Sequence, residues 1–239
     1  MNILWLDTID STNSEALRRL LELPSGTVLA AREQTAGRGQ RGNTWFSQPG
    51  KNLTFSIVLK NLPLVASQAI RLNFLFSVAV ADFLQARGVE ASIKWPNDIY
   101  VGGRKICGML IENTLGPGGK LAASVVGIGL NINQKDFPQL ANATSLALCT
   151  GMEYGLEDSL EAFLAIFDTL WPRLLDSSLL ESYTSRLFRR DVPARYHDLL
   201  TDQEYTGVIE GVAPDGRLCI LDPAGKRHYY QFKEVSYIL

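Results

Sequence analysis

A pair of glycines between two β-forming runs constrains this chain most strongly. Residues 99–101 and 106–111 are mostly apolar, and the glycines at 102–103 between them are typical of a two-residue hairpin turn. We therefore expect a β-hairpin over residues 99–111. The hairpin fixes the local register of whatever sheet the chain builds, because a tight turn leaves few ways to pair its strands.

Lys105 lies in the second strand of the expected hairpin. Alternation across the pleat would place it beside Cys107, on the side opposite Gly108. An ammonium among apolar neighbours must be paired or meet a ligand anion, because a dry, isolated charge is costly. The sequence KWPND at 94–98 adds a second cation, an aromatic ring and a carboxylate just before the hairpin. The simpler alternatives are a lysine that extends into solvent and ordinary turn chemistry at 96–98.

The sequence GRGQRG at residues 37–42 is a candidate anion-binding loop. Its glycines allow a ligand to approach the backbone closely, and its two arginines add fixed positive charge. It is not a dinucleotide-binding fingerprint, because no apolar run leads directly into it and no helical pattern follows it. It also lacks the Gly-Lys-Ser/Thr ending of a P-loop. An exposed loop without a ligand is the alternative.

These two motifs together resemble those of the biotin protein ligases. The glycine loop is followed by Trp-Phe at 45–46, and KWPND is followed by RKICG at 104–108. DSTN at 10–13 and GIGLNIN at 127–133 are further matches, and all four motifs occur in the family's order at similar spacing. The resemblance covers nearly the whole chain.

The resemblance implies an α+β fold. Its catalytic domain would be a mixed or antiparallel β-sheet packed with helices, of the kind found in class II synthetases, and a small SH3-like β-barrel would follow it. We expect the catalytic domain at residues 1–190 and the SH3-like domain at 191–239, because short strands and Pro/Gly/Asp turns take over near the end of the chain.

The resemblance also implies a two-step reaction. Biotin and ATP, with Mg²⁺, would give biotinyl-5'-AMP and pyrophosphate, and the biotinyl group would then pass to a lysine of a biotin carboxyl carrier protein. The first step brings two anions together, so cations that neutralise both lower the barrier. The family match gives catalytic roles to Arg38 and Lys105, and we assign Asp98 to orienting or deprotonating the acceptor amine.

The remaining site residues follow from the same match. Those expected to bind biotin are Ser11, Thr12, Asn13, Gln34, Arg38, Gly39, Gln40, Lys105, Gly108, Gly127 and Gly129, with Trp95 and Leu110 as apolar neighbours. Those expected to bind the nucleotide are Arg38, Arg41, Trp45, Lys94, Asn97 and Asn131. The metal ligands stay unknown.

Two of these groups also have a purely structural interpretation. Residues 12–15 read Thr-Asn-Ser-Glu, a capping box that would begin a helix whether or not a ligand binds there. Gly127 and Gly129 would share one face of a strand, where missing side chains indicate close approach by a ligand or by another part of the chain.

Gln40 departs from the family pattern. Many biotin protein ligases have arginine at this loop position, which helps to retain the reactive adenylate. Our hypothesis is that retention of the adenylate is tuned differently in this chain.

The rest of the chain predicts alternating strands and helices. We expect strands at 3–6, 27–31, 53–59 and 121–132, and helices at 64–87, 156–171 and 179–187. Four short strands at 206–212, 217–221, 227–232 and 235–238 would form the terminal module.

Charge and composition limit the partners and the cellular compartment that we expect for the protein. A formal net charge of −2 provides no global basic field for nonspecific nucleic-acid binding, and the first catalytic motif begins about ten residues from the start, so we expect no specific DNA binding. The early acid at Asp7 argues against a signal peptide, and the three scattered cysteines suit a reducing compartment. We expect a cytoplasmic protein without a membrane span, as a monomer or a homodimer.

Two other functions are weighed against biotin ligation. A lipoate-type ligase shares the fold and the adenylate chemistry, but the loop and KWPND favour biotin. A sensor that binds biotin or its adenylate without catalysis is the alternative from another class. Two histidines remote from the motifs make a histidine-based catalyst or a zinc site improbable.

Overall fold

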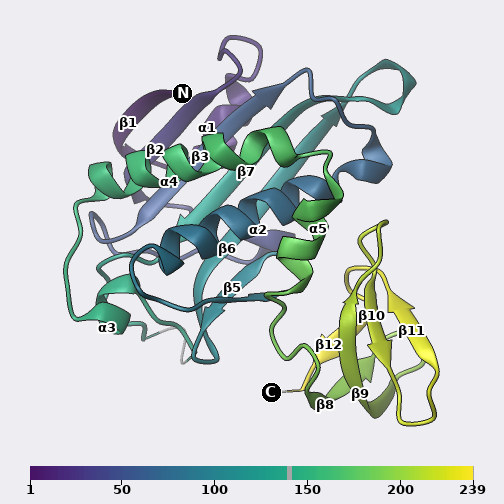
Figure 1. Ribbon diagram of the computed structural model, residues 1–239. Coiled ribbons are helices and arrows are strands. Elements are labelled where there is room, and N and C mark those ends of the chain that lie inside the picture. Colours follow the sequence, from purple (N-terminus) through teal and green to yellow (C-terminus); the bar gives the residue numbers. More distant parts are fainter. Residues whose placement is uncertain (139–141, 239) are drawn as a thin grey trace.

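A seven-stranded mixed sheet forms the centre of the molecule (Figure 1). The computed structural model describes residues 1–138 and 142–238, with the side chain of Arg41 left out. The strand order is β1-β2-β3-β7-β6-β5-β4, in which β1 and β2 pair in parallel and the other neighbours pair antiparallel. The strands are β1 (Asn2–Ile9), β2 (Thr27–Gln34), β3 (Leu53–Lys60), β4 (Ser92–Lys94), β5 (Asp98–Val101), β6 (Arg104–Leu115) and β7 (Leu121–Leu130). The predicted α+β sheet is confirmed.

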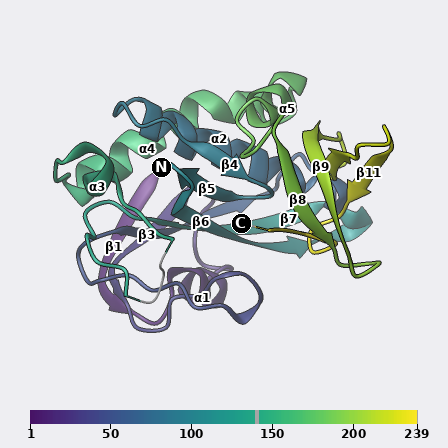
Figure 2. The same ribbon diagram turned by 90° about the horizontal axis from the view of Figure 1, so that it is seen from below.

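Helices cover both faces of this sheet, but unequally. The larger helices α2 (Ile70–Gln85), α4 (Leu156–Leu170) and α5 (Ser177–Thr184) lie on one face, and the short α1 (Thr12–Arg18) lies on the other (Figure 2). Alternation along β3 and β7 explains this, because Phe55 and Ile128 belong to the large core under α2 and α4, whereas Val58 and Val125 pack against α1. The face that carries α1 is therefore only partly covered by helix.

The predicted hairpin is present, but the side chain of Lys105 lies on the face of the hairpin opposite to the predicted one. Lys105 pairs with Tyr100 while Cys107 pairs with Ile99, so the register shifts by one residue at a β-bulge. A bulge interrupts the alternation of side chains. Cys107 is consequently buried in the core, and Lys105 shares the opposite face with Gly108.

The start of α1 also differs from the prediction. Ser11 is the N-cap, and its hydroxyl accepts a hydrogen bond from the backbone N–H of Ser14 at 3.5 Å. Thr12 is the first helical residue, so the predicted capping box at 12–15 is wrong. The hydroxyl of Thr12 is engaged by Gln34 instead.

Several boundaries move, and two elements were not predicted. The helix expected from residue 64 begins at Ile70, after a 3₁₀ turn at Ala66–Gln68, because apolar periodicity does not mark where regular hydrogen bonding starts. The unpredicted elements are the short helix α3 (Leu146–Thr150) and the strand β8 (Pro193–Asp198). Further 3₁₀ turns are η1 (Gln40–Gly42), η3 (Pro117–Gly119) and η4 (Trp171–Arg173).

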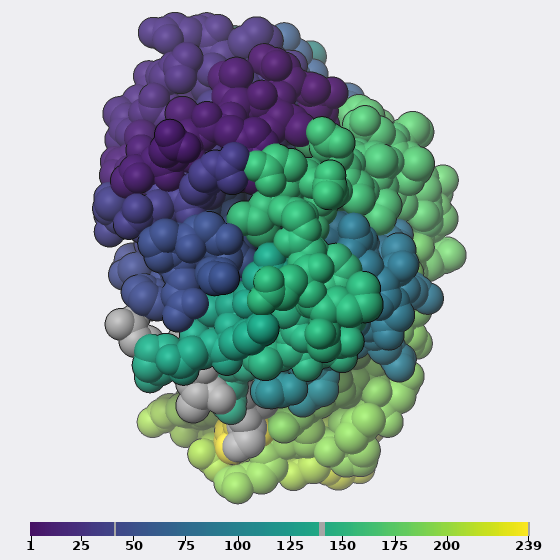
Figure 3. All heavy atoms as spheres, turned by 90° about the vertical axis from the view of Figure 1, so that its left-hand side faces the viewer, coloured from purple at the N-terminus to yellow at the C-terminus, as the bar shows by residue number. Residues whose placement is uncertain are grey.

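A separate antiparallel sheet closes the chain. It contains β8, β9 (Gln203–Val212), β10 (Leu218–Leu221), β11 (Arg227–Tyr230) and β12 (Val235–Tyr237) in the order β11-β10-β9-β8-β12. We call this sheet and its turns, residues 193–238, the C-terminal module. It lies at the opposite end of the molecule from the N-terminal residues (Figure 3). A domain boundary between residues 190 and 191 stays a prediction.

The C-terminal module rests on the KWPND segment. The indole Nε1 of Trp95 donates a hydrogen bond to the carbonyl oxygen of Gly216 at 3.0 Å, and its ring meets that of Phe232 edge to face. The ammonium of Lys94 lies 5.0 Å from the centre of the Tyr237 ring and 5.3 Å from that of Tyr100.

Within residues 1–138 and 142–238, no helix combines the length and the apolar character needed to cross a membrane.

Candidate active site

A cavity opens on the face of the sheet that carries α1. It is lined by the start of α1, the end of β2, the glycine loop and the middle of β6 and β7. The lining residues are Ser11, Thr12, Asn13, Gln34, Arg38, Gly39, Gln40, Asn43, Thr44, Trp45, Asp98, Lys105, Gly108, Met109, Leu110, Gly127, Ile128 and Gly129. All eleven residues predicted to bind biotin and all three predicted to be catalytic are among them, although their roles stay predictions.

Glycines make the floor of the cavity. In the register of β6 with β7, Gly108 pairs with Gly129 and Leu110 pairs with Gly127. A Cβ atom at Gly127 would overlap the carboxamide of Asn13, and one at Gly129 would overlap the indole of Trp45. The expected close approach is therefore made by two side chains of the protein itself, one at each end of the floor.

A buried polar cluster forms the end of the cavity nearest α1. The carboxamide oxygen of Gln34 accepts hydrogen bonds from the backbone N–H of Thr12 at 2.8 Å and from its hydroxyl at 3.2 Å. The hydroxyl of Ser56 lies 2.8 Å from that of Thr12 and donates to Oδ1 of Asn13 at 2.6 Å. Sequence patterns did not single out Ser56, because within β3 it reads as one small residue of a buried strand.

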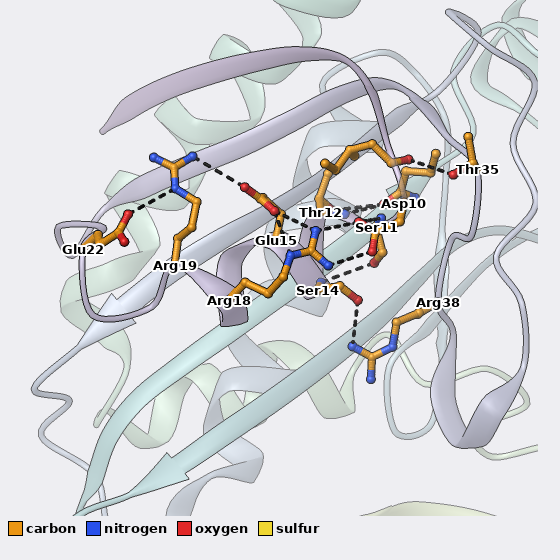
Figure 4. A network of polar contacts seen from close by, with 12 residues as sticks. Asp10, Ser11, Thr12, Ser14, Glu15, Arg18, Arg19, Glu22, Thr35 and Arg38 are labelled. Carbon is orange, nitrogen blue, oxygen red and sulfur yellow. Dashed lines mark hydrogen bonds and ion pairs between the residues drawn. The ribbon is translucent and has the colours of Figure 1, made fainter.

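Helix α1 is also tied to the glycine loop and to the acid that precedes it (Figure 4). Arg38 reaches the hydroxyl of Ser14 at 3.4 Å, and Arg18 forms an ion pair with Asp10 at 2.7 Å. The hydrogen bond from Arg18, with help from the backbone N–H of Ser11, lowers the pKa of Asp10 to about 2. Asp10 is therefore a charged anchor immediately before the cavity residues of α1.

Two cations reach the cavity, and each has a carboxylate partner. The ammonium of Lys105 lies 2.7 Å from Asp98, with about a third of each side chain exposed. The guanidinium of Arg38 binds Glu112 through both terminal nitrogens, at 3.1 Å and 2.8 Å. These pairs are accessible to an anionic ligand, which could compete with either carboxylate.

The glycine loop folds back on itself over the cavity. The backbone N–H of Gly39 donates to the carbonyl of Asn43 at 2.7 Å, and that of Trp45 donates to the carbonyl of Gly37 at 2.9 Å. A Cβ atom at Gly37 would overlap the carbonyl oxygen of Trp45, so this close return requires glycine. The ring of Trp45 then lies over Gly108 and Gly129.

Gln40 fastens this loop to the body of the protein. Its amide nitrogen donates to Oδ1 of Asn97 at 2.9 Å and to the carbonyl of Met109 at 3.2 Å. Asn97 in turn donates to Asn73 on α2 at 2.9 Å. The side chain that departs from the family pattern therefore bridges the loop to the sheet and to α2.

Of the predicted nucleotide-binding residues that the structure describes, three do not line the cavity. Lys94 lies between aromatic rings under the C-terminal module, where burial lowers its pKa. Asn97 is buried and its amide is engaged by Gln40, Asn73 and Met109. Asn131 lies just beyond the end of β7, and the side chain of Arg41 lies outside the described residues. Trp95, expected beside biotin, instead anchors the C-terminal module.

Two buried polar atoms, one on Trp45 and one just after β7, have no hydrogen-bond partner among the described residues. They are Nε1 of Trp45 and Oδ1 of Asn131, a donor and an acceptor. Asn131 follows Gly129 by two residues, and the Trp45 ring lies on Gly129. Unpaired buried polar groups are costly, so each of these atoms is a candidate partner for a bound ligand.

Histidine, cysteine and acidic side chains do not gather into a metal site in the described part of the chain, where no cluster of three or more occurs. Cys107 lies under the floor, and burial raises the pKa of its thiol. This thiol is therefore protonated at neutral pH and inert as a nucleophile.

The fold and the cavity together define a class of protein, an α+β protein whose mixed sheet carries paired cations and an amide-rich pocket. More specifically, the chain belongs to the biotin/lipoate A/B protein ligase family, whose model matches residues 5–131. It is 32% identical over 230 residues to the biotin–acetyl-CoA-carboxylase ligase of Paracoccus denitrificans, covering 91% of this chain and 93% of that one.

Two further comparisons agree with this assignment. The chain is 32% identical over 221 residues to the bifunctional ligase/repressor BirA of Escherichia coli, covering 90% of this chain and 68% of that one. The biotin protein ligase of Aquifex aeolicus, solved with biotin and ATP, superposes with a TM-score of 0.80 at 27% identity and covers 98% of this chain and 97% of that one.

Proposed function

We infer that this protein is an ATP-dependent biotin protein ligase. It activates biotin to biotinyl-5'-AMP with release of pyrophosphate and then transfers biotin to a lysine of a biotin carboxyl carrier protein. The likeness to the Paracoccus ligase over nearly the full length of both chains supports this activity, as does the likeness to the Aquifex ligase in its complex with biotin and ATP.

One observation carries the inference. Two cations, Arg38 and Lys105, enter one cavity whose far end is lined by buried hydroxyls and amides. Activation joins two anions, because a carboxylate oxygen of biotin attacks the α-phosphorus of ATP and pyrophosphate leaves. Cations at that point offset the repulsion between the reactants and stabilise the charge that develops on the phosphoryl oxygens.

The polar end of the cavity suits the head group of biotin. A ureido ring carries two N–H donors and one carbonyl acceptor, and Ser11, Thr12, Asn13 and Gln34 offer both kinds of partner within a few ångströms. The mutual hydrogen bonds of this cluster hold it in shape before the ligand arrives, which reduces the entropy lost on binding.

The opposite end suits the adenine of the nucleotide. The indole of Trp45 provides an aromatic face for stacking, and we propose that the oxygen of Asn131, which has no partner among the described residues, becomes accessible as an acceptor for an exocyclic amine. Arg38 and Lys105 would then face the phosphate between the two ends. We propose Mg²⁺ as the companion of ATP, with phosphate oxygens and water supplying most of its ligands.

Transfer requires a neutral lysine amine at the mixed anhydride. The amine attacks the acyl carbon, AMP leaves with the phosphate oxygen, and the proton of the amine goes to a base. Asp98 is our choice for orienting or deprotonating that amine, because its carboxylate lies beside Lys105 and lines the cavity. We also propose a cytoplasmic monomer or homodimer that does not bind DNA specifically.

Biotin-dependent release of pyrophosphate from ATP tests the activity. The purified protein should release pyrophosphate with biotin and not with lipoate, and Lys105→Ala should abolish the release. Release with lipoate alone would make the protein a lipoate ligase. Tight biotin binding without any release would make it a sensor.

A further inference from the structure

Glu112 is not among the residues that line the cavity, yet its carboxylate holds two residues that do. Its Oε1 accepts from one terminal nitrogen of Arg38 at 2.8 Å, and its Oε2 accepts from the other at 3.1 Å. The same Oε2 accepts from Nδ2 of Asn13 at 3.0 Å. One side chain of β6 thus joins the glycine loop to the start of α1.

The position of Glu112 on the sheet explains this reach. Residues 108, 110 and 112 of β6 share the face that carries the cavity, and Glu112 lies one step beyond the glycine floor. About a quarter of its side chain is exposed. The carboxylate therefore accepts one hydrogen from each terminal nitrogen of Arg38, and the hydroxyl of Ser14 is a further partner of the guanidinium.

Arg38 depends on such a partner for its position. The backbone hydrogen bonds of the glycine loop run within the loop, from Gly39 to Asn43 and from Trp45 to Gly37. Side chains must therefore fix the loop to the sheet. A bidentate carboxylate sets both the position and the plane of a guanidinium, which a single hydrogen bond does not.

Asn13 depends on the same carboxylate. Its Nδ2 donates to Glu112 and to the carbonyl of Leu110, while its Oδ1 accepts from Ser56. These three contacts fix which way the amide faces. Because Asn13 and Arg38 share Glu112, the polar end of the cavity and its cation cannot move independently.

We propose that Glu112 is a positioning residue of the ligase reaction, one that sets Arg38 and Asn13 relative to each other so that the biotin carboxylate meets the α-phosphate. This rests on the proposed function. An exposed ion pair adds little to folding stability. A folded variant that loses rate therefore separates positioning from a merely structural role.

The first test is Glu112→Gln. The amide keeps the shape of the side chain, but its NH₂ group cannot accept, so Arg38 or Asn13 loses a partner. Glu210→Gln is the matched control, because Glu210 also binds an arginine through both oxygens, Arg227 at 2.7 Å and 3.1 Å, on the C-terminal module. We expect kcat/KM for biotin-dependent pyrophosphate exchange to fall about tenfold in Glu112→Gln and to stay unchanged in Glu210→Gln. A tenfold loss lies near the middle of the range of coupling energies between residues in contact.

A double-mutant cycle with Arg38→Gln gives the decisive readout. If Glu112 acts through Arg38, adding Glu112→Gln to Arg38→Gln should cost much less than it costs alone. Glu112→Asp, which keeps the charge but withdraws it by one methylene, should retain an intermediate rate. Fully additive losses, or an equal loss in Glu210→Gln, would overturn the proposal.

Limited trypsin digestion tests the inference without relying on the enzymatic activity. Releasing Arg38 from Glu112 should speed cleavage within residues 37–45 severalfold in Glu112→Gln relative to the wild type and to Glu210→Gln. Unchanged cleavage would overturn the proposed role of Glu112. Absence of biotin-dependent exchange in the wild type would overturn the proposed function alone.

Discussion

Alanine at Gly127 or at Gly129 should separate the two ends of the cavity. The glycines lie two residues apart on the same strand and face, so the substitutions add the same methyl group to nearly the same backbone. At Gly127 the methyl displaces Asn13, which has hydrogen bonds to Leu110, Glu112 and Ser56. At Gly129 it displaces the ring of Trp45.

The structure sets the size of each effect. Displacing Asn13 disturbs three hydrogen bonds, each with a net value of about 1 kcal/mol, so a loss of about 1–3 kcal/mol in biotin binding is expected. Stacking of a base on an aromatic side chain contributes about 1–3 kcal/mol, so ATP binding should weaken by a similar amount when Trp45 moves. Either loss corresponds to a rise in KM of about 5-fold to 150-fold.

Biotin-dependent exchange of labelled pyrophosphate into ATP measures both constants. Gly127→Ala should raise the KM for biotin and change that for ATP by a smaller factor, because the methyl group displaces Asn13 directly and reaches Arg38 only through their shared partner Glu112. Gly129→Ala should do the reverse. Thermal unfolding controls for damage to the sheet, and each variant serves as the control for the other. Equal changes in both constants for both variants would refute this division of the cavity.

Four further outcomes are expected. Gln40→Arg should slow dissociation of biotinyl-5'-AMP, measured by stopped-flow chase; faster dissociation than in the wild type would contradict our hypothesis of a weakened hold. Asp98→Asn should slow single-turnover transfer to the carrier more than formation of the adenylate, and an equal effect on both would remove Asp98 as the base. Tyr183→Phe should lower the free energy of unfolding by about 1 kcal/mol in urea, because the buried hydroxyl donates to the carbonyl of Pro96 at 2.7 Å, and an unchanged value would refute that contribution. The pKa of Asp10 is lowered from 3.8 to about 2, so its contribution to folding stability is present above about pH 4 and is lost as the pH falls toward 2. Asp10→Asn should therefore flatten that part of the plot of melting temperature against pH. An unchanged plot would exclude Asp10 as the source of the slope.

Local patterns in the sequence predicted the parts of the fold that depend on neighbours along the chain. The hairpin followed from its glycine turn, and the glycine pair of β7 indicated close approach before its partners were known. The side assigned to Lys105 was wrong, because one bulged residue reverses the alternation and no local pattern marked it. β8 was missed for a related reason, since its mixed polar sequence lacks the alternation of a half-buried strand.

The partners within the site could not be predicted in the same way. Asn13 meets Glu112 across 99 positions, and Ser56 meets Thr12 across 44. Spacing along a chain says nothing about such pairs until the sheet register is known. The motifs predicted the side chains that a ligand would contact. The residues that position those side chains, Ser56 and Glu112, belong to strands whose patterns indicate only burial and pairing.

The contact of Trp95 with Gly216 changes how inactive mutants of this protein should be mapped. Gly216 has a φ of 90°, and a Cβ atom there would press on Ile70 of α2. Any substitution would strain the turn at Gly216 and disturb its hydrogen bond with Trp95. Trp95 lies three residues before Asp98, so the disturbance would reach the segment that carries Asp98. A genetic selection for lost biotinylation should therefore return mutations at Gly216. By location they would be counted as mutations of the C-terminal module, and by effect as mutations of the active site.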